Sequence, residues 1–237
     1  MGTTNTAFKI MSNTPNLPYR ALIFDWDGTL MDSESRIVNC LRKACADVIG
    51  KEERTDNELK DVIGLGLREA LLRLYPGQGD ELIETMAESY RNHYLYHDET
   101  PSELFDGVEA LLESLENQGY WLAIATGKGR QGLDQVLEYT GLTDRFHVTR
   151  CASETFSKPH PLMLEEILDK LGIDARDALM IGDTEYDMEM ALNADMDRLA
   201  VSYGVHSQSR LLKHKPIGCL HDICELPAYL NQLHQDN

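Results

Sequence analysis

Four short clusters along the chain contain side chains that can carry out phosphoryl transfer. A carboxylate can attack phosphorus, a second carboxylate can move protons, a hydroxyl and an ammonium group can hold phosphate oxygens, and paired carboxylates can bind a divalent metal ion. The residues are Asp25 and Asp27 in DWDGTL, Thr126 after WLAIA, Lys158 in SKPHP, and Asp183 and Asp187 in GDTEYD. This set of residue types predicts metal-assisted chemistry on a phosphate group.

The segments around these clusters predict that distant side chains meet. RALIFD (20–25), WLAIAT (121–126) and ALMIGD (178–183) each run apolar and then end on a polar residue, which is typical of buried parallel strands. LAVSYGVHS (199–207) is expected to supply a further main strand, and 216–233 a short edge strand and a closing helix. Helical patterns between the strands predict an α/β fold with right-handed crossovers. Ligands of such sheets bind beyond the carboxyl ends of the strands, where Asp25, Thr126 and Asp183 are placed.

The segment between the first two clusters is too long for one crossover. Apolar residues recur every three or four positions in 35–49, 57–63, 67–75 and 80–96, which predicts several helices. We expect an all-α unit over 34–103, with an α/β core made of 19–33 and 104–237. Hinges are expected near 32–35 and 100–105. The polar stretch 1–18 is expected to be a disordered tail.

The order DxDGT, Thr, Lys-Pro, GDxxxD resembles the haloacid dehalogenase superfamily of phosphohydrolases, from about Tyr19 to the C-terminus. The resemblance implies a Rossmann-like parallel sheet with helices on both faces, and a helical cap domain inserted after the first strand. DWDGTLMDS and a cap loop with two glycines are similar to the phosphoglycolate phosphatase branch. The chain departs from that branch at Gly127, where those phosphatases commonly have asparagine.

The chemistry of a carboxylate nucleophile calls for a metal ion. Asp25 would face a phosphate dianion, and two like charges about 4 Å apart repel by roughly 4 kcal/mol at an effective dielectric constant near 20. Mg²⁺ held by Asp25 and Asp183 would cancel this repulsion. The resemblance adds the backbone carbonyl of Asp27, and Asp187 directly or through water. Asp187 can also be read as an acid in the first turn of a helix.

The resemblance also implies roles for the remaining residues of the site. Lys158 would hold the nucleophile and the transferred phosphoryl group. The hydroxyl of Thr126, with the backbone amides of Trp26 and Gly127, would bind phosphoryl oxygens. Asp27 would protonate the leaving alcohol and then activate the hydrolytic water. An aspartate at this position favours phosphate esters, because the dehalogenases and phosphonate-cleaving members lack it.

Two further groups of cations are candidates for binding substrate. Arg68 in the glycine-containing segment 63–71 is suited to a substrate carboxylate or a second phosphate, and is equally consistent with a solvated helix residue. Lys128 and Arg130 follow Thr126 and would add positive potential.

Taken together, these features predict a Mg²⁺-dependent phosphatase that forms an aspartyl-phosphate. Its substrate would be a small phosphorylated metabolite, either phosphoglycolate-like or a sugar or nucleoside monophosphate. The first alternative is a phosphosugar mutase similar to β-phosphoglucomutase. The second, which the residues favour less, is a noncatalytic member whose cap binds another protein. The four intact clusters favour an enzyme.

Composition restricts the partners. The 237-residue chain has a formal charge of −18, which disfavours nucleic acid and acidic membranes as partners. Its five cysteines show no CxxC spacing, which favours a reducing cytoplasm. No apolar run is long enough to span a bilayer. We expect a cytoplasmic monomer or homodimer.

Overall fold

The computed structural model describes residues 17–51 and 54–235. Most of the tail expected over 1–18 therefore lies outside the described residues, and Leu17 packs against the hydrophobic core. No helix in the described part of the chain is both long enough and apolar enough to cross a membrane.

A six-stranded parallel sheet forms the centre of the molecule, which confirms the predicted fold class. The strand order is β5-β4-β1-β6-β7-β8. The strands are β1 (Ala21–Phe24), β4 (Trp121–Thr126), β5 (Val148–Cys151), β6 (Ala178–Gly182), β7 (Asp197–Val201) and β8 (Gly218–Leu220). The strand β1 lies between β4 and β6, so the three strands that carry the predicted site residues are neighbours.

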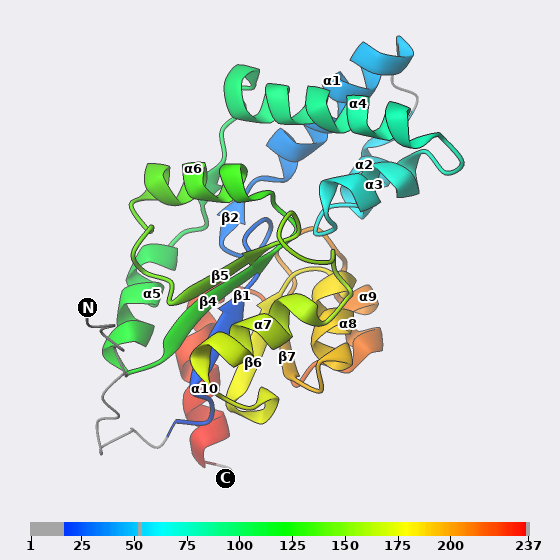
Figure 1. Cartoon of the computed structure of the whole chain (residues 1–237). Helices are drawn as coiled ribbons and strands as arrows, with labels where there is room; N and C mark the ends of the chain where they lie inside the picture. The colour runs from blue at the N-terminus through cyan, green and yellow to red at the C-terminus, as the bar shows by residue number, and fades with distance from the viewer. Residues whose placement is uncertain (1–16, 52–53, 236–237) are drawn as a thin grey trace, which may run out of the picture.

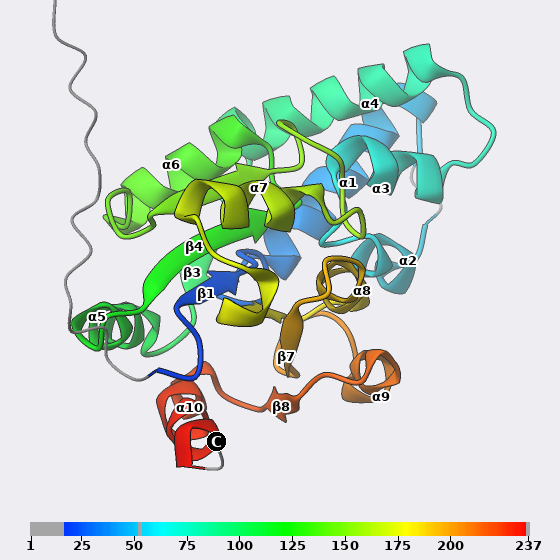
Figure 2. The same cartoon turned by 60° about the horizontal axis from the view of Figure 1, so that its bottom comes forward.

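Helices cover both faces of the sheet, as Figure 2 shows. Side chains alternate along each strand, so β1 sends Leu22 and Phe24 to one face and Ala21 and Ile23 to the other. The first face packs against α5 (Val108–Asn117), α6 (Arg130–Thr140) and α10 (Leu226–Gln235). The second packs against α7 (Leu162–Leu171) and α8 (Glu185–Asn193). The short helix α9 (Gln208–Leu211) and the 3-10 turns η2 (Ala175–Asp177), η3 (Leu212–His214) and η4 (Ile223–Glu225) complete this part.

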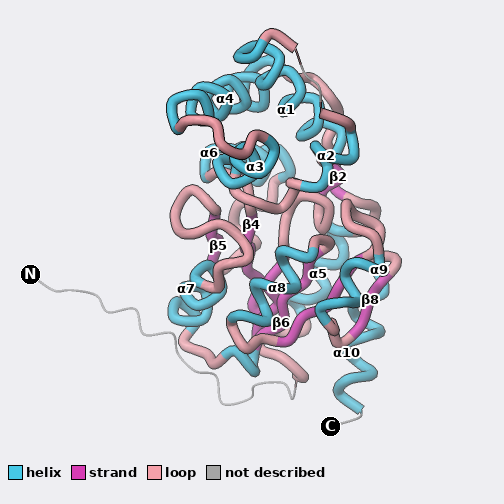
Figure 3. The backbone as a smooth tube through the Cα atoms, turned by 90° about the vertical axis from the view of Figure 1, so that its right-hand side faces the viewer, coloured by secondary structure: helices cyan, strands magenta, loops and turns pink. Residues whose placement is uncertain are grey.

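A helical unit stands over the carboxyl ends of the strands, away from α10 (Figures 1 and 3). We call its members the cap helices: α1 (Glu34–Ile49), α2 (Asp56–Asp61), α3 (Leu67–Leu74), α4 (Asp80–Asn92) and the π-helical turn η1 (His93–His97). They enclose an apolar cluster of their own, in which α1 packs along α4. Thr55 and Glu58 form a capping box that starts α2.

The two chain crossings between the sheet and the cap helices pair with each other. Strand β2 (Met31–Asp32) runs antiparallel to β3 (Glu103–Leu104), close to both predicted hinges. A two-stranded ribbon thus forms the base of the cap helices. A second connection lies on another side, where the guanidinium of Arg210 in α9 contacts the carboxylates of Asp61 in α2 and Glu185 in α8.

Candidate active site

Three buried carboxylates meet at the carboxyl ends of β1 and β6. Asp25 follows β1, Asp183 follows β6, and Asp187 lies in the first turn of α8. One oxygen of each lies within 4.8 Å of an oxygen of the others. The backbone amide of Asp25 donates to the carbonyl of Ile181 at 2.9 Å, which fixes the end of β1 beside the end of β6.

The two oxygens of the Asp25 carboxylate have different surroundings. Oδ1 accepts hydrogen bonds from the backbone amide of Trp26 at 2.7 Å and from Nζ of Lys158 at 2.8 Å. Oδ2 is buried and has no hydrogen-bond partner among the described residues. Burial raises the pKa of Asp25 well above its ordinary value, against the opposing effect of Lys158. One oxygen is therefore oriented and the other is uncommitted, as a nucleophile or metal ligand requires.

Asp183 is held by both of its oxygens. Oδ1 accepts from the hydroxyl of Thr29 at 2.9 Å, and Oδ2 accepts from the amide of Val205 at 2.8 Å. Burial, followed by the charge of Asp187, raises the pKa of Asp183 to about 7. The raised pKa means that the ionised form of Asp183 is destabilised in the metal-free site.

The cluster suits a hard divalent cation. Carboxylate oxygens are the ligands that Mg²⁺ prefers, and the uncommitted Oδ2 of Asp25 would gain a partner from such an ion. Gly28 brings the backbone close to the same place: its φ is +80°, and a β-carbon there would lie 2.3 Å from Oδ2 of Asp183. Only glycine provides this approach and this backbone conformation. The residues present therefore fit a magnesium site.

Lys158 lies between two of the carboxylates and is fully buried. Its Nζ is 2.8 Å from Oδ1 of Asp25 and 2.6 Å from Oδ1 of Asp187. Burial lowers the pKa of Lys158, but the carboxylates of Asp187 and Asp25 outweigh burial and raise it above the ordinary value. The lysine is thus a permanent cation at this site. Asp187 also completes a capping box with Thr184, so its helix-cap and charge-pairing roles coexist.

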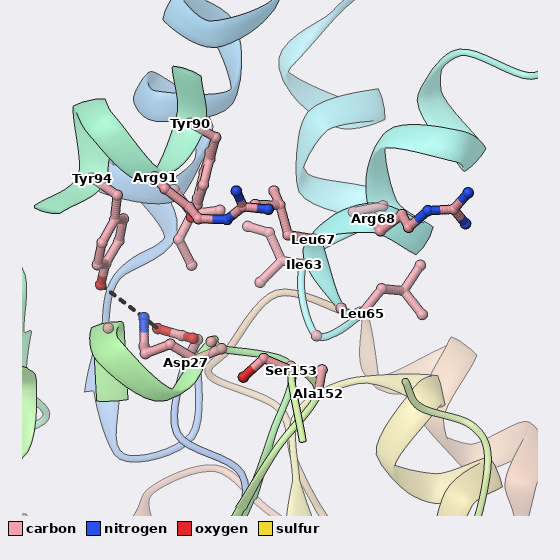
Figure 4. A pocket seen from close by; sticks show the side chains of 18 of the residues that line it. Asp27, Ile63, Leu65, Leu67, Arg68, Tyr90, Arg91, Tyr94, Ala152 and Ser153 are labelled. Atoms are coloured by element: carbon pink, nitrogen blue, oxygen red, sulfur yellow. Dashed lines mark hydrogen bonds and ion pairs between the residues drawn. The ribbon is translucent and has the colours of Figure 1, made fainter. Parts of the chain in front are cut away.

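Asp27 lies in a hydrogen-bonded chain that reaches the cap helices. Its Oδ1 accepts from the hydroxyl of Ser33 at 2.6 Å and lies 2.9 Å from Nζ of Lys128. The same Nζ donates to the hydroxyl of Tyr94 in η1 at 2.7 Å, as Figure 4 shows. Burial lowers the pKa of Lys128, whereas Asp27 and Tyr94 raise it, and the net effect is upward. Lys128 therefore supports Asp27 rather than adding a free charge. Sequence reasoning missed Tyr94 and Ser33.

The groups predicted to bind phosphate lie at the same edge of the sheet, formed by the carboxyl ends of the strands, which we call the rim. Thr126 is buried at the end of β4, and its hydroxyl oxygen accepts from the amide of Lys128 at 3.1 Å. The amide of Trp26 already donates to Asp25. At Gly127, a β-carbon would lie 2.5 Å from the carbonyl oxygens of Gly64 and Leu65 in the cap. The glycine that departs from the family pattern thus lets the cap loop rest on the core.

The structure does not bring Arg68 to the carboxylates. Its guanidinium pairs with Asp80 and Glu84 and points away from Asp27 (Figure 4). Arg91 extends instead from α4 toward Leu67 in the same view. Arg68 is among the residues that line the cavity described below, but its guanidinium is paired with carboxylates of α4, so its role in substrate binding stays a prediction.

A cavity of about 470 Å³ lies between the rim and the cap helices. Asp25, Asp27, Gly127 and Lys128 line it on the core side. Residues of α1, α3, α4, η1 and the loop after α2 line it on the cap side. A ligand in this cavity would contact the carboxylates and the cap helices at the same time.

Comparison with known proteins agrees with this geometry. A family model described as "Haloacid dehalogenase-like hydrolase" matches residues 22–201. "Probable phosphatase IndB" of Dickeya dadantii is 33% identical over 201 residues, covering 82% of this chain and 86% of that protein. "Phosphoglycolate phosphatase" of Aliivibrio fischeri is 32% identical, covering 83% and 90%. A solved structure of "a predicted phosphatase from Clostridium acetobutylicum" superposes with a TM-score of 0.82 at 26% identity, covering 90% and 99%.

Proposed function

Because the chain belongs to the haloacid dehalogenase-like hydrolases, we propose that it hydrolyses small phosphate monoesters with Mg²⁺ through an aspartyl-phosphate on Asp25. The observation that carries the proposal is the Asp25 carboxylate, buried at the rim, with one oxygen held by Lys158 and Trp26 and the other without a partner among the described residues. The held oxygen fixes the orientation of the carboxylate, and the partner-free oxygen is available to a metal ion or to phosphorus.

Asp25, Asp183 and Asp187 would hold Mg²⁺, together with the backbone carbonyl of Asp27. The bound ion supplies positive charge that offsets the repulsion between the substrate dianion and the carboxylates. Lys158 adds a second cation that aligns Asp25 and binds phosphoryl oxygens as a point charge. The hydroxyl of Thr126 and the amide of Gly127 would donate to the same oxygens.

Asp27 moves the protons in both halves of the proposed reaction. In the first half, its carboxyl proton passes to the ester oxygen as Asp25 bonds to phosphorus and the alcohol leaves. In the second half, the Asp27 carboxylate takes a proton from the water that attacks the phosphorus of the aspartyl-phosphate. Asp25 and inorganic phosphate are then released. Ser33 and Lys128 hold the Asp27 oxygen in place for both transfers.

We further propose that the division into a core (19–33 and 104–237) and a cap (34–103) serves this chemistry. The cap helices cover the rim and exclude bulk water, while the ribbon of β2 and β3 is the segment about which they would move. Tyr94 and the loop at Gly64 and Leu65 are the cap elements that contact the core beside Asp27 and Gly127.

The test is hydrolysis of p-nitrophenyl phosphate with and without Mg²⁺. We expect metal-dependent turnover that Asp25→Asn abolishes while its circular dichroism spectrum stays that of the wild type. Asp169→Asn is the matched control, since Asp169 is an exposed aspartate on α7, outside both the site and the ribbon. Turnover retained by Asp25→Asn would exclude the covalent mechanism.

A further inference from the structure

The cap side of the cavity is mainly apolar. Aliphatic side chains of α1, the loop after α2, α3 and η1 line it, and Tyr90 and Tyr94 add aromatic rings. The aliphatic residues are Ile37, Leu41, Val62, Ile63, Leu65, Leu67 and Leu95. Figure 4 shows Ile63, Leu67 and Tyr90 on the side of the cavity that faces Asp27. The leaving group of a phosphate held at Asp25 would therefore meet hydrocarbon surface.

The cations that line this cavity are each within ion-pair distance of a carboxylate. The pairs are Arg68 with Asp80 and Glu84, Arg91 with Glu84, Lys128 with Asp27, and Arg130 with Asp134 and Glu154. Glu69 adds a further acidic side chain to the lining. A leaving group with its own negative charge would have to compete with these carboxylates for the cations. Its loss of hydration would therefore be offset less than in a site with unpaired cations.

The size of the cavity also disfavours a very small leaving group. At about 470 Å³, it lies within the range of roughly 300–1,000 Å³ that is typical of sites for drug-sized ligands. A glycolate group next to Asp27 would leave Ile63, Leu67 and Tyr90 facing water. A larger alcohol would cover these side chains.

We propose, on the basis of the phosphatase function above, that the natural leaving group is an uncharged alcohol with a bulky apolar or aromatic body. This body packs against Ile63, Leu67 and Tyr90 while the phosphate is held at Asp25. Such a leaving group differs from glycolate, the leaving group of the substrate that the name of one relative specifies.

The experiment compares two matched ligand series. The first consists of n-alkyl phosphates from ethyl to hexyl, assayed as kcat/KM for phosphate release, with 2-phosphoglycolate as the charged short ester. The second consists of the corresponding n-alkylphosphonates, assayed by calorimetric binding in the presence of Mg²⁺. Burial of each methylene is expected to raise kcat/KM and affinity about threefold to fourfold, on the order of 100-fold from ethyl to hexyl. We expect 2-phosphoglycolate to be a poorer substrate than propyl phosphate.

A pair of variants on one helix tests the location of the apolar contact. Leu67→Gln changes a residue that lines the cavity, whereas Leu72→Gln makes the same change at a partly buried position of α3 outside the lining. We expect Leu67→Gln to lower the hexyl-to-ethyl ratio severalfold and Leu72→Gln to leave it unchanged. A ratio that falls equally in both variants would place the apolar contact elsewhere and overturn the proposal.

The outcomes separate this proposal from the phosphatase function. Hydrolysis without chain-length dependence, or with 2-phosphoglycolate preferred and that preference lost in Arg91→Met, leaves the phosphatase and refutes the apolar leaving group. Phosphonate affinity that rises with chain length, with no ester hydrolysed, supports the apolar cavity and refutes the phosphatase. If no ester is hydrolysed and no phosphonate binds, both proposals are wrong.

Discussion

Replacing Asp183 by asparagine should stabilise the metal-free protein at neutral pH. The folded chain raises the pKa of this carboxyl to about 7 through burial and the charge of Asp187, from an ordinary value of 3.8. A raised carboxyl pKa contributes stability at low pH that is lost as the pH rises through the folded pKa. The wild type should therefore lose stability between about pH 4 and pH 7. The amide side chain of the Asp183→Asn variant does not ionise, so the variant should lack this loss.

The size of the effect follows from the same pKa. Each pKa unit corresponds to about 1.4 kcal/mol, so the advantage of Asp183→Asn over wild type should grow by roughly 3 kcal/mol between pH 5 and pH 8. Asparagine can preserve the local hydrogen bonds. Its carbonyl oxygen can accept from the Val205 amide, and its amino group can donate to the hydroxyl oxygen of Thr29, which also accepts hydrogen bonds.

The measurement is urea unfolding in EDTA at pH 5 and pH 8, followed by tryptophan fluorescence. It is then repeated at pH 8 with Mg²⁺ in place of EDTA. An ion at about 100 times its dissociation constant stabilises the wild type by about 2.7 kcal/mol, and this gain should be largely absent in Asp183→Asn. Asp169→Asn, an exposed change on α7, should show neither effect. A variant advantage that is the same at both pH values would refute the electrostatic reasoning.

Two further changes probe the contacts between the cap helices and the core. Lys128→Met removes the cation that joins Asp27 to Tyr94, so we expect kcat to fall by roughly 100-fold and its pH profile to shift, with a smaller change in KM. An unchanged kcat would show that Lys128 does not support Asp27. Gly127→Ala places a β-carbon 2.5 Å from the carbonyls of Gly64 and Leu65. It should raise KM and increase cleavage of the cap by protease, at a stability cost of about 1–3 kcal/mol, whereas Gly129→Ala, with no atom near its β-carbon, is the control.

The sequence predicts the core well because parallel strands impose strong constraints. An apolar run that ends on a polar residue places that residue at the carboxyl rim, and this rule applies to Asp25, Thr126 and Asp183 alike. In the structure β1 pairs with β4 on one side and with β6 on the other, so these three polar residues become neighbours. The contact of Lys158 with Asp187 is different, because it joins a loop before α7 to α8 and no periodicity specifies it.

The sequence predicts the cap less well, because helical periodicity identifies a buried face and not what that face meets. Arg68 and Arg91 both lie on cap helices, and only packing decides that Arg68 turns toward Asp80. Tyr94 reads as one more apolar position of a long helix, yet the π-helical turn η1 places its hydroxyl on Lys128. Gly127 reads as a departure from a family pattern until the cap loop is seen against it.

The contacts of Lys128 suggest that closure and proton transfer are coupled. The ammonium group of Lys128 contacts Asp27 on the core and Tyr94 on the cap helices at the same time. Both contacts that position Lys128 beside Asp27 are therefore present only while η1 covers the rim. In the proposed first half-reaction, the leaving group fills the cavity beside Asp27 and excludes water. Once the alcohol has left, the same cavity gives water access to the aspartyl-phosphate at the residue that must activate it. A mutase would have to keep this space closed between its two steps. Hydrolysis requires water to reach this cavity of about 470 Å³, whereas a mutase requires the cavity to hold a second phosphorylated substrate, so release of inorganic phosphate distinguishes the two reactions.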